Sequence, residues 1–151
     1  MSMRLLLLLL LAFSLQSAQA QAGKDSTAIK GTLRAWNSAL QAKNLGKALA
    51  IFDDSPQTLM VGSAPGEIFQ GKAAIRKVLS AFLNYSEVVL NLSRARIDGN
   101  GNTAWVFVEG TIKVAGGGSV AEEPYRVSIV LVRRNGAWKW RLFHGDVPKE
   151  N

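Results

Sequence analysis

The residues best suited to proton transfer in this sequence are one histidine and a few carboxylates. His144 is the only histidine, and it follows an alternating segment that begins at Trp138. A neutral imidazole in such a place can serve as a general base or as a hydrogen-bond donor. Glu109 stands in an expected strand and shares one strand face with Trp105 and Phe107, because side chains alternate along a strand. If that face points inward, Glu109 becomes a possible acid or base. His144 and Glu109 are therefore the candidate catalytic residues.

Both candidates also have a purely structural interpretation. His144 could simply satisfy a backbone carbonyl at the end of its strand. Glu109 could face outward and pair with a lysine or arginine on the sheet surface. The sequence leaves the direction of Glu109 open, because the opposite strand face is equally apolar, with Val106, Val108 and Ile112.

The remaining carboxylates and the scarcity of metal ligands limit other kinds of chemistry. Asp53 and Asp54 end an expected helix, where carboxylates commonly serve turns, and Asp54 is a candidate for a pocket rim. Asp146 follows His144 by two residues, but no nucleophile-elbow sequence accompanies them, so a Ser-His-Asp triad is not adopted. The chain has no cysteine. With a single imidazole, we expect no metal site and no cofactor.

Residues 1–20 have the three parts of a secretory signal peptide. Arg4 supplies a positive start, Leu5–Leu11 an apolar run, and Ala18-Gln19-Ala20 a small-residue exit. The apolar run is shorter than the roughly 20 residues that span a bilayer, which favours cleavage over an uncleaved anchor. We expect cleavage after Ala20, with Ala22 as the alternative. The mature domain, residues 21–151, is then periplasmic or secreted, without a stable membrane anchor.

The chain is basic, with a formal net charge of +7. Basic surfaces attract phosphates, acidic lipid headgroups or acidic proteins. The lysines and arginines are spread along the sequence with no run longer than two, and they form no motif that argues for nucleic-acid binding. Nucleic acid is therefore not an expected partner, and solvated surfaces are the simpler interpretation.

Hydrophobic spacing predicts three helices in the N-terminal half. Asp25 can cap the first, and apolar residues then recur at intervals of three and four, at Ile29, Leu33, Trp36 and Leu40. A second helix is expected over 45–52 and a third after Gly71. Residues 57–61 and 67–70 are expected to form two short strands joined by a turn.

The apolar period changes to two from residue 86 onward, which predicts strands over 87–97, 103–114, 125–134 and 137–144. The Asn135-Gly136 pair favours a type I′ hairpin. The resulting order, ααββαββββ, is that of an α+β domain in which helices cover one face of a curved antiparallel sheet. A cavity between the layers could be lined by Trp36, Tyr125 and Trp140, although such aromatic residues also suit a plain core.

Three stretches resemble the SnoaL-like members of the nuclear transport factor 2-like superfamily. They are Phe52–Asp54 with 61–67 and 71–76, then Trp105–Gly110, and finally Trp138–His144. The resemblance covers the whole expected mature chain. It implies a cone-shaped fold, with three N-terminal helices packed on a strongly curved antiparallel sheet around a pocket, commonly in a homodimer. It implies no particular reaction.

Ketosteroid isomerase is the best-understood of these relatives, and its chemistry needs a carboxylate base, a tyrosine and a protonated aspartic acid. The resemblance puts Leu59 where the base would stand, in the wall of the pocket. The first helix has Trp36 but no tyrosine, and the strand 125–134 has no acid at the matching place. Steroid isomerase chemistry is therefore not expected.

Three functions remain open at this point. The first is an exported domain that binds a small, largely apolar molecule in the pocket between helices and sheet, lined by Trp36, Leu59, Tyr125, Trp140 and Asp54. The second is a pocket enzyme, an isomerase, dehydratase or hydrolase that uses His144 with a carboxylate. The third is a non-catalytic module for dimerisation or for interaction with another protein.

Overall fold

The computed structural model describes residues 25–116 and 119–148. The expected signal peptide and its cleavage sites lie outside these residues. Within the described part, no helix combines the length and the apolar character needed to cross a membrane.

The described strands form one seven-stranded sheet with the order β2-β1-β7-β6-β5-β3, and β4 also pairs with β5. The strands are β1 (Leu59–Val61), β2 (Ile68–Gln70), β3 (Ser86–Leu90), β4 (Arg96–Asn100), β5 (Thr103–Gly116), β6 (Ser119–Arg134) and β7 (Ala137–Asp146). Asn135 and Gly136 have φ angles of 50° and 80°, so the β6–β7 hairpin turns with two left-handed residues as predicted.

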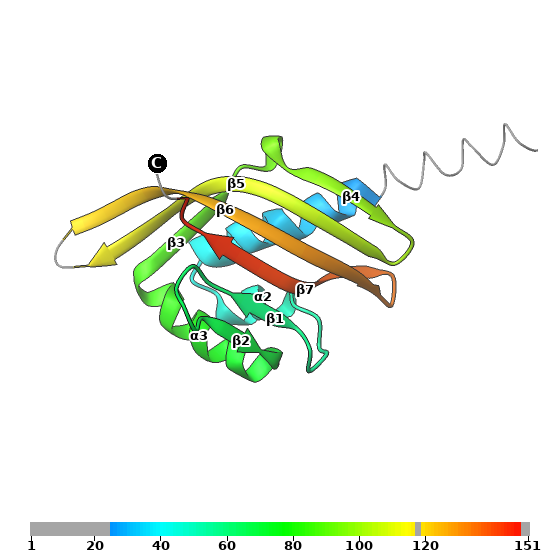
Figure 1. The fold of residues 1–151 in the computed structure, drawn as a ribbon, viewed down its shortest axis with the longest axis horizontal. Helices are drawn as coiled ribbons and strands as arrows, with labels where there is room; N and C mark the ends of the chain where they lie inside the picture. The colour runs from blue at the N-terminus through cyan, green and yellow to red at the C-terminus, as the bar shows by residue number, and fades with distance from the viewer. Residues whose placement is uncertain (1–24, 117–118, 149–151) are drawn as a thin grey trace, which may run out of the picture.

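The helices pack on one face of this sheet. The first covers residues 25–41 of the described chain, α2 spans Leu45–Ala50 and α3 spans Gly71–Tyr85. The Asn44 side chain accepts a 2.9 Å hydrogen bond from the Lys47 amide and so starts α2 directly after the preceding turn. In Figure 1 the first helix runs behind β5 and β6, while α2 and α3 lie beside β1 and β2.

The predicted α+β fold is confirmed, with differences in detail. The strand expected over 125–134 begins earlier, at Ser119. The expected strand 87–97 is two strands, because the 3-10 turn Leu92–Arg94 separates β3 from β4. The Asn91 side chain caps this turn by accepting from the Ser93 amide at 3.2 Å. The sheet is also not wholly antiparallel, since β1 runs parallel to β7.

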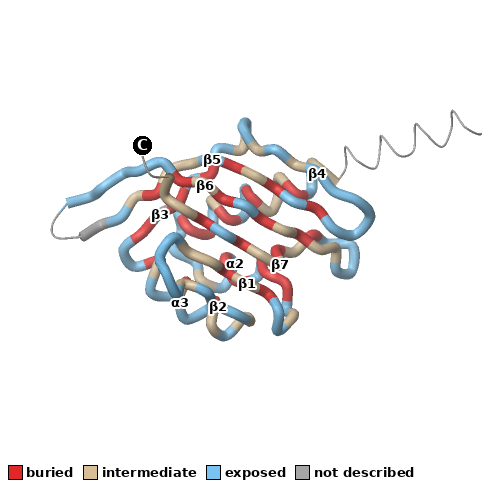
Figure 2. The backbone as a smooth tube through the Cα atoms, viewed as in Figure 1, coloured by how far each residue is buried: buried red, intermediate tan, exposed pale blue. Residues whose placement is uncertain are grey.

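The hydrophobic core fills the space between the helices and the inner face of the sheet. Its buried members come from every layer, with Ile29, Leu33, Leu40, Leu49, Ile75, Leu79, Val106, Val108, Val127, Ile129 and Leu131 among them. Figure 2 shows buried and more exposed residues alternating along β5, β6 and β7, as expected for strands with one covered and one open face. We call the open face, which turns away from the helices, the outer face.

Candidate functional site

A β-bulge in β7 decides which way the candidate histidine points. The β6–β7 register slips at Arg141, which has no partner of its own on β6. Before the bulge Trp138 and Trp140 are buried, and after it Phe143 is buried while His144 is exposed. The expected single inward face from Trp138 to His144 is therefore wrong. The prediction assumes that side chains alternate strictly between the two faces from Trp138 to His144, and the extra residue of the bulge breaks this alternation.

The two candidate catalytic residues do not meet in the fold. His144 lies on β7 and Glu109 on β5, with β6 between them. At about 4.8 Å per strand, their backbones are roughly 10 Å apart across the sheet, well beyond hydrogen-bond reach. Glu109 faces outward, 4.0 Å from Arg94, and Asp146 pairs with Arg126 at 2.9 Å. The outward alternative for Glu109 is the one observed, and these residues assemble no acid–base pair.

The interior beside the first helix is filled by four aromatic side chains. Trp36, Phe52, Trp140 and Phe143 are each at most 1% exposed. The Trp36 ring centroid lies 5.0 Å from that of Trp140 and 5.3 Å from that of Phe143. Trp140 Nε1 donates a 2.8 Å hydrogen bond to Thr32 Oγ1. The space in which Trp36 and Trp140 were expected to line a pocket is thus occupied by these side chains themselves.

The other predicted pocket residues lie in separate places. Leu59 pairs with Leu142 on the outer face, because Met60 is the β1 residue that points inward. Tyr125 is buried on β6 beside the end of β7, where burial, helped by the negative charges of Asp146 and Glu67, raises the pKa of its phenol to about 12.

Asp54 belongs to the surface rather than to a pocket rim. Its side chain is 86% exposed and pairs with Lys72. The hydrogen bond and positive charge of Lys72 lower the pKa of the Asp54 carboxyl below its usual range.

The neighbouring Asp53 is a buried carboxylate whose partners the sequence did not reveal. Only 5% of its side chain is exposed, and it lies between two arginines from β6 and β7. Arg134 Nε donates to Asp53 Oδ1 at 3.2 Å, and Arg141 Nη2 lies 2.9 Å from Oδ2 without the alignment of a hydrogen bond. Because Arg141 is the bulge residue, Asp53 ties the loop after α2 to the point where β7 changes face.

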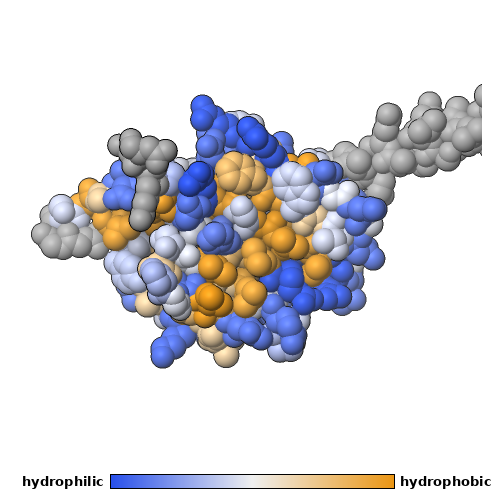
Figure 3. Space-filling view, in the orientation of Figure 1, coloured by the Kyte–Doolittle hydropathy of each residue, from blue (hydrophilic) through white to orange (hydrophobic). Residues whose placement is uncertain are grey.

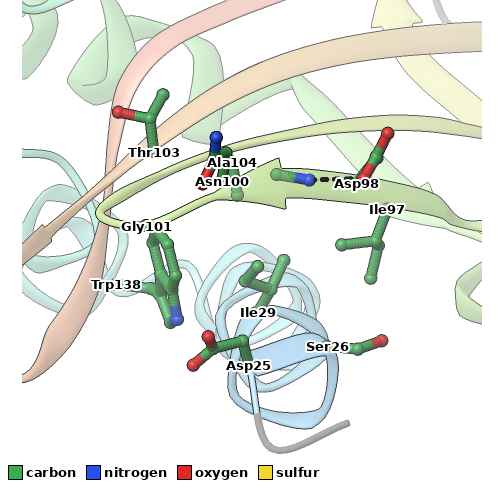
Figure 4. A pocket seen from close by; sticks show the side chains of 11 residues that line it. Asp25, Ser26, Ile29, Ile97, Asp98, Asn100, Gly101, Thr103, Ala104 and Trp138 are labelled. Atoms are coloured by element: carbon green, nitrogen blue, oxygen red, sulfur yellow. Dashed lines mark hydrogen bonds between the residues drawn. The ribbon is translucent and has the colours of Figure 1, made fainter. Parts of the chain in front are cut away.

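A small cavity opens beside the start of the first helix (Figure 4). Its volume is about 140 Å³. Ile29, Ile97, Ala104 and Trp138 supply apolar walls, and Asp25 and Asp98 are among the polar lining residues. Asp25 is already paired with Arg133, whose guanidinium lies 4.6 Å from the Trp138 ring centroid. This space is smaller than the 300–1,000 Å³ typical of small-molecule pockets.

The outer face carries the most extended apolar surface among these features. Strand registers place one row of side chains straight across the sheet from β2 to β4: Gln70, Leu59, Leu142, Val130, Trp105 and Asp98. We call this the apolar row, since its four central members are hydrophobic. Trp105 is 48% exposed. Figure 3 shows hydrophobic side chains at the centre of this face and hydrophilic ones around them.

A second row runs beside the apolar row. It contains Ile68, Val61, His144, Ser128, Phe107 and Arg96. His144 therefore lies among largely apolar and uncharged neighbours on an open surface. The sequence contains both rows, but they become visible only once the registers and the bulge at Arg141 are known.

Comparison with known proteins identifies the fold. The family model for the SnoaL-like domain matches residues 29–148. A search of curated proteins gives no match.

Solved structures with the same fold are similar at low sequence identity. A candidate scytalone dehydratase from Novosphingobium aromaticivorans has a TM-score of 0.76 at 14% identity, over 87% of this chain and 89% of that one. A nuclear transport factor 2-like protein from Salmonella enterica has a TM-score of 0.74 at 17% identity, over 86% and 95%. A candidate calcium/calmodulin-dependent protein kinase II association domain from Xanthomonas campestris has a TM-score of 0.65 at 19% identity, over 77% and 82%.

At these identities the solved structures establish the architecture and leave activity to be argued from the residues. The architecture is the nuclear transport factor 2-like fold, and the family match spans almost the whole described chain. The chain belongs to the SnoaL-like domain family.

Proposed function

We propose that this protein is a non-catalytic assembly module that associates with a second copy through the outer face of its sheet. The observation that carries the proposal is the apolar row, whose centre of Leu59, Leu142, Val130 and Trp105 crosses four adjacent strands on an uncovered face. Contiguous exposed apolar surface of this kind is uncommon on monomers and marks interaction sites.

The charges around the apolar row suit contact between two identical faces. Beside the rows, Arg126 pairs with Asp146 and Arg94 approaches Glu109, so both signs are present in each protomer. A two-fold interface brings the same patch together from both subunits, and a patch of one sign would repel itself. Here the opposite signs balance, which favours a second copy of this chain over a strongly charged partner.

The part of β6 that extends past β7 has an open strand edge, and this edge is a poorer docking site than the outer face. Beyond Tyr125, β6 extends past the end of β7, and this stretch carries Glu122, Glu123 and Pro124. Proline cannot donate a backbone hydrogen bond, and charged residues disfavour edge-to-edge pairing. Association is therefore expected through side chains of the outer face.

The filled interior supports a non-catalytic role. Trp36, Phe52, Trp140 and Phe143 occupy the region in which a substrate would be held, and His144 and Glu109 are two strands apart on an open surface. Some solved structures of this fold are named as candidate dehydratases and another as a candidate association domain. The side chains of the present protein favour the latter kind of role.

The experiment is a comparison of solution mass for three proteins by light scattering after gel filtration. The wild type should be a dimer, and Trp105→Glu should be a monomer, because a buried charge in the apolar row is costly. Val120→Glu is the matched control, since Val120 is 68% exposed but lies outside both rows. A monomeric wild type, or a dimer that survives Trp105→Glu and is lost in Val120→Glu, would contradict the proposal.

A second candidate function is the binding of a very small, partly apolar molecule in the cavity beside Ile29 and Trp138. The 140 Å³ cavity is the observation that favours it. Filling the cavity with Ala104→Leu should then abolish ligand-induced thermal stabilisation. An unchanged thermal shift in that variant would rule out this cavity as the binding site.

We also propose that the chain acts outside the cytoplasm, because residues 1–20 have the composition of a signal peptide. N-terminal sequencing of the protein from its own host should begin at Gln21 or Gly23. A sequence that begins at Met1 would contradict export by cleavage.

A further inference from the structure

The positive charge of this protein is distributed unevenly between its two layers. On the strands and their connections, all the described basic residues except Arg96 and Lys139 form an ion pair: Arg94, Lys113, Arg126, Arg133, Arg134 and Arg141. Among the described residues of the helix side, only Lys72 does so. The other basic residues there have no ion pair within the described residues: Lys30, Arg34, Lys43, Lys47, Arg76 and Lys77.

The lack of acidic residues in the helices leaves this charge uncompensated. Neither α2 nor α3 contains an aspartate or glutamate, and the first helix contains only Asp25, which pairs with Arg133. The unbalanced charge of the described fold therefore gathers on the side opposite the outer face.

A shallow groove at the α2–α3 junction is lined by one of these unpaired residues, Arg76, and by Lys72, which pairs with Asp54. Its lining combines the small residues Gly46, Ala50 and Ala73 with the longer side chains of Leu49, Lys72 and Arg76. Lys47 adjoins Gly46 in α2, and Lys77 adjoins Arg76 on the exposed side of α3.

We propose that this basic helix surface, defined by the exposed Lys47 of α2 and the exposed Arg76 and Lys77 of α3, docks the protein on an anionic lipid membrane. The charge is carried mainly by dispersed lysines, which act as point charges toward any anionic surface. Each lysine or arginine close to an anionic membrane surface contributes about 1 kcal/mol to the free energy of binding. Single-stranded nucleic acid would call for aromatic stacking platforms between the bases, and Trp36, Phe52 and Phe82 of this region are buried or half-buried.

This surface is separate from the one proposed for self-association, so the two can be used together. The apolar row faces away from the helices, and the basic helix surface lies on the helix side of the sheet. Membrane docking therefore does not depend on dimerisation, and a Trp105→Glu monomer should still bind vesicles. If dimerisation fails but vesicle binding is retained, only the self-association proposal is contradicted. If vesicle binding fails but the protein is still a dimer, only the membrane proposal is contradicted.

The test is flotation of the mature protein, purified from its own host, with vesicles of phosphatidylcholine alone or with phosphatidylglycerol. Binding is expected only to the vesicles that contain phosphatidylglycerol, and added salt should weaken it. Replacement of Lys47, Arg76 and Lys77 together by Gln should lower the partition constant on the order of 100-fold, at about fivefold per base.

The matched control removes the same charge from the sheet side by replacing Arg94, Arg96 and Lys113 with Gln. It should bind almost as well as the wild type. Three results would overturn the proposal: equal loss of binding in both triple variants, equal binding to neutral vesicles, or retention by duplex DNA without binding to either vesicle. Unchanged thermal unfolding of each variant establishes that its fold is intact.

Discussion

Two tryptophans in the core offer a direct check on whether the interior is a packed core or a ligand site. Trp36 and Trp140 are 1% and 0% exposed, and their ring centroids lie 5.0 Å apart within the same aromatic cluster. Trp36→Phe and Trp140→Phe remove the same atoms from equally buried rings, so their losses of apolar burial should nearly cancel in a comparison.

The polar contributions of the two indoles differ in sign. Trp140 Nε1 donates to Thr32 Oγ1, and removing that bond costs about 1 kcal/mol net. Trp36 Nε1 is buried without a partner among the described residues. Replacing Trp36 by Phe removes this unpaired N–H group, which should offset the loss of stability by about 1–3 kcal/mol. Trp140→Phe should therefore destabilise the protein by about 2–4 kcal/mol more than Trp36→Phe.

Urea denaturation followed by far-ultraviolet circular dichroism measures this difference without relying on tryptophan fluorescence. Equal slopes of free energy against urea would show that both variants unfold from equally compact states. If Trp36→Phe proved the more costly substitution, the Trp36 indole would have a partner in the interior. That result would refute the packed-core interpretation and restore the ligand pocket expected from the sequence.

Two further predictions follow from the titratable groups. Asp53→Asn should lower the free energy of unfolding by about 1–3 kcal/mol, because it weakens a buried ion pair with two arginines that reach solvent, whereas Asp54→Asn should leave it unchanged in the same urea titration. Because the pKa of Tyr125 is about 12 when folded and about 10 when unfolded, the unfolded chain loses its proton first as pH rises. Stability should therefore fall by about 2 kcal/mol between pH 10 and pH 12, and Tyr125→Phe should lose this part of the decline.

The fold was predictable from the sequence to a large extent, because its signals are local. The three-and-four spacing of Ile29, Leu33, Trp36 and Leu40 indicates the first helix, and all four residues are buried. The Asn135-Gly136 pair indicates a type I′ turn, and both residues have positive φ. Signals of this kind depend only on residues close together in the sequence, so they can be interpreted without knowledge of tertiary contacts.

The candidate site was less predictable, because it depends on strand registers and on the bulge at Arg141. Strict alternation put Leu142 and His144 on the core face, whereas the extra residue turns both outward. The direction of Glu109 stayed open, since both faces of β5 are apolar in sequence. Tertiary packing decides it: Val106 and Val108 are buried in the core, which leaves Trp105 and Glu109 on the outer face. The Asp53–Arg141 contact joins residues far apart in the chain and has no local signal.

The proposal that the outer face joins two copies is tested most directly by cross-linking of single-cysteine variants, which the absence of native cysteine makes unambiguous. Ser128 is exposed beside the apolar row, and Ser80 is exposed on α3 on the helix side. A flexible bismaleimide should trap Ser128→Cys as a covalent dimer and leave Ser80→Cys monomeric. Cross-linking of Ser80→Cys but not of Ser128→Cys, or of neither, would contradict association through the outer face of the sheet.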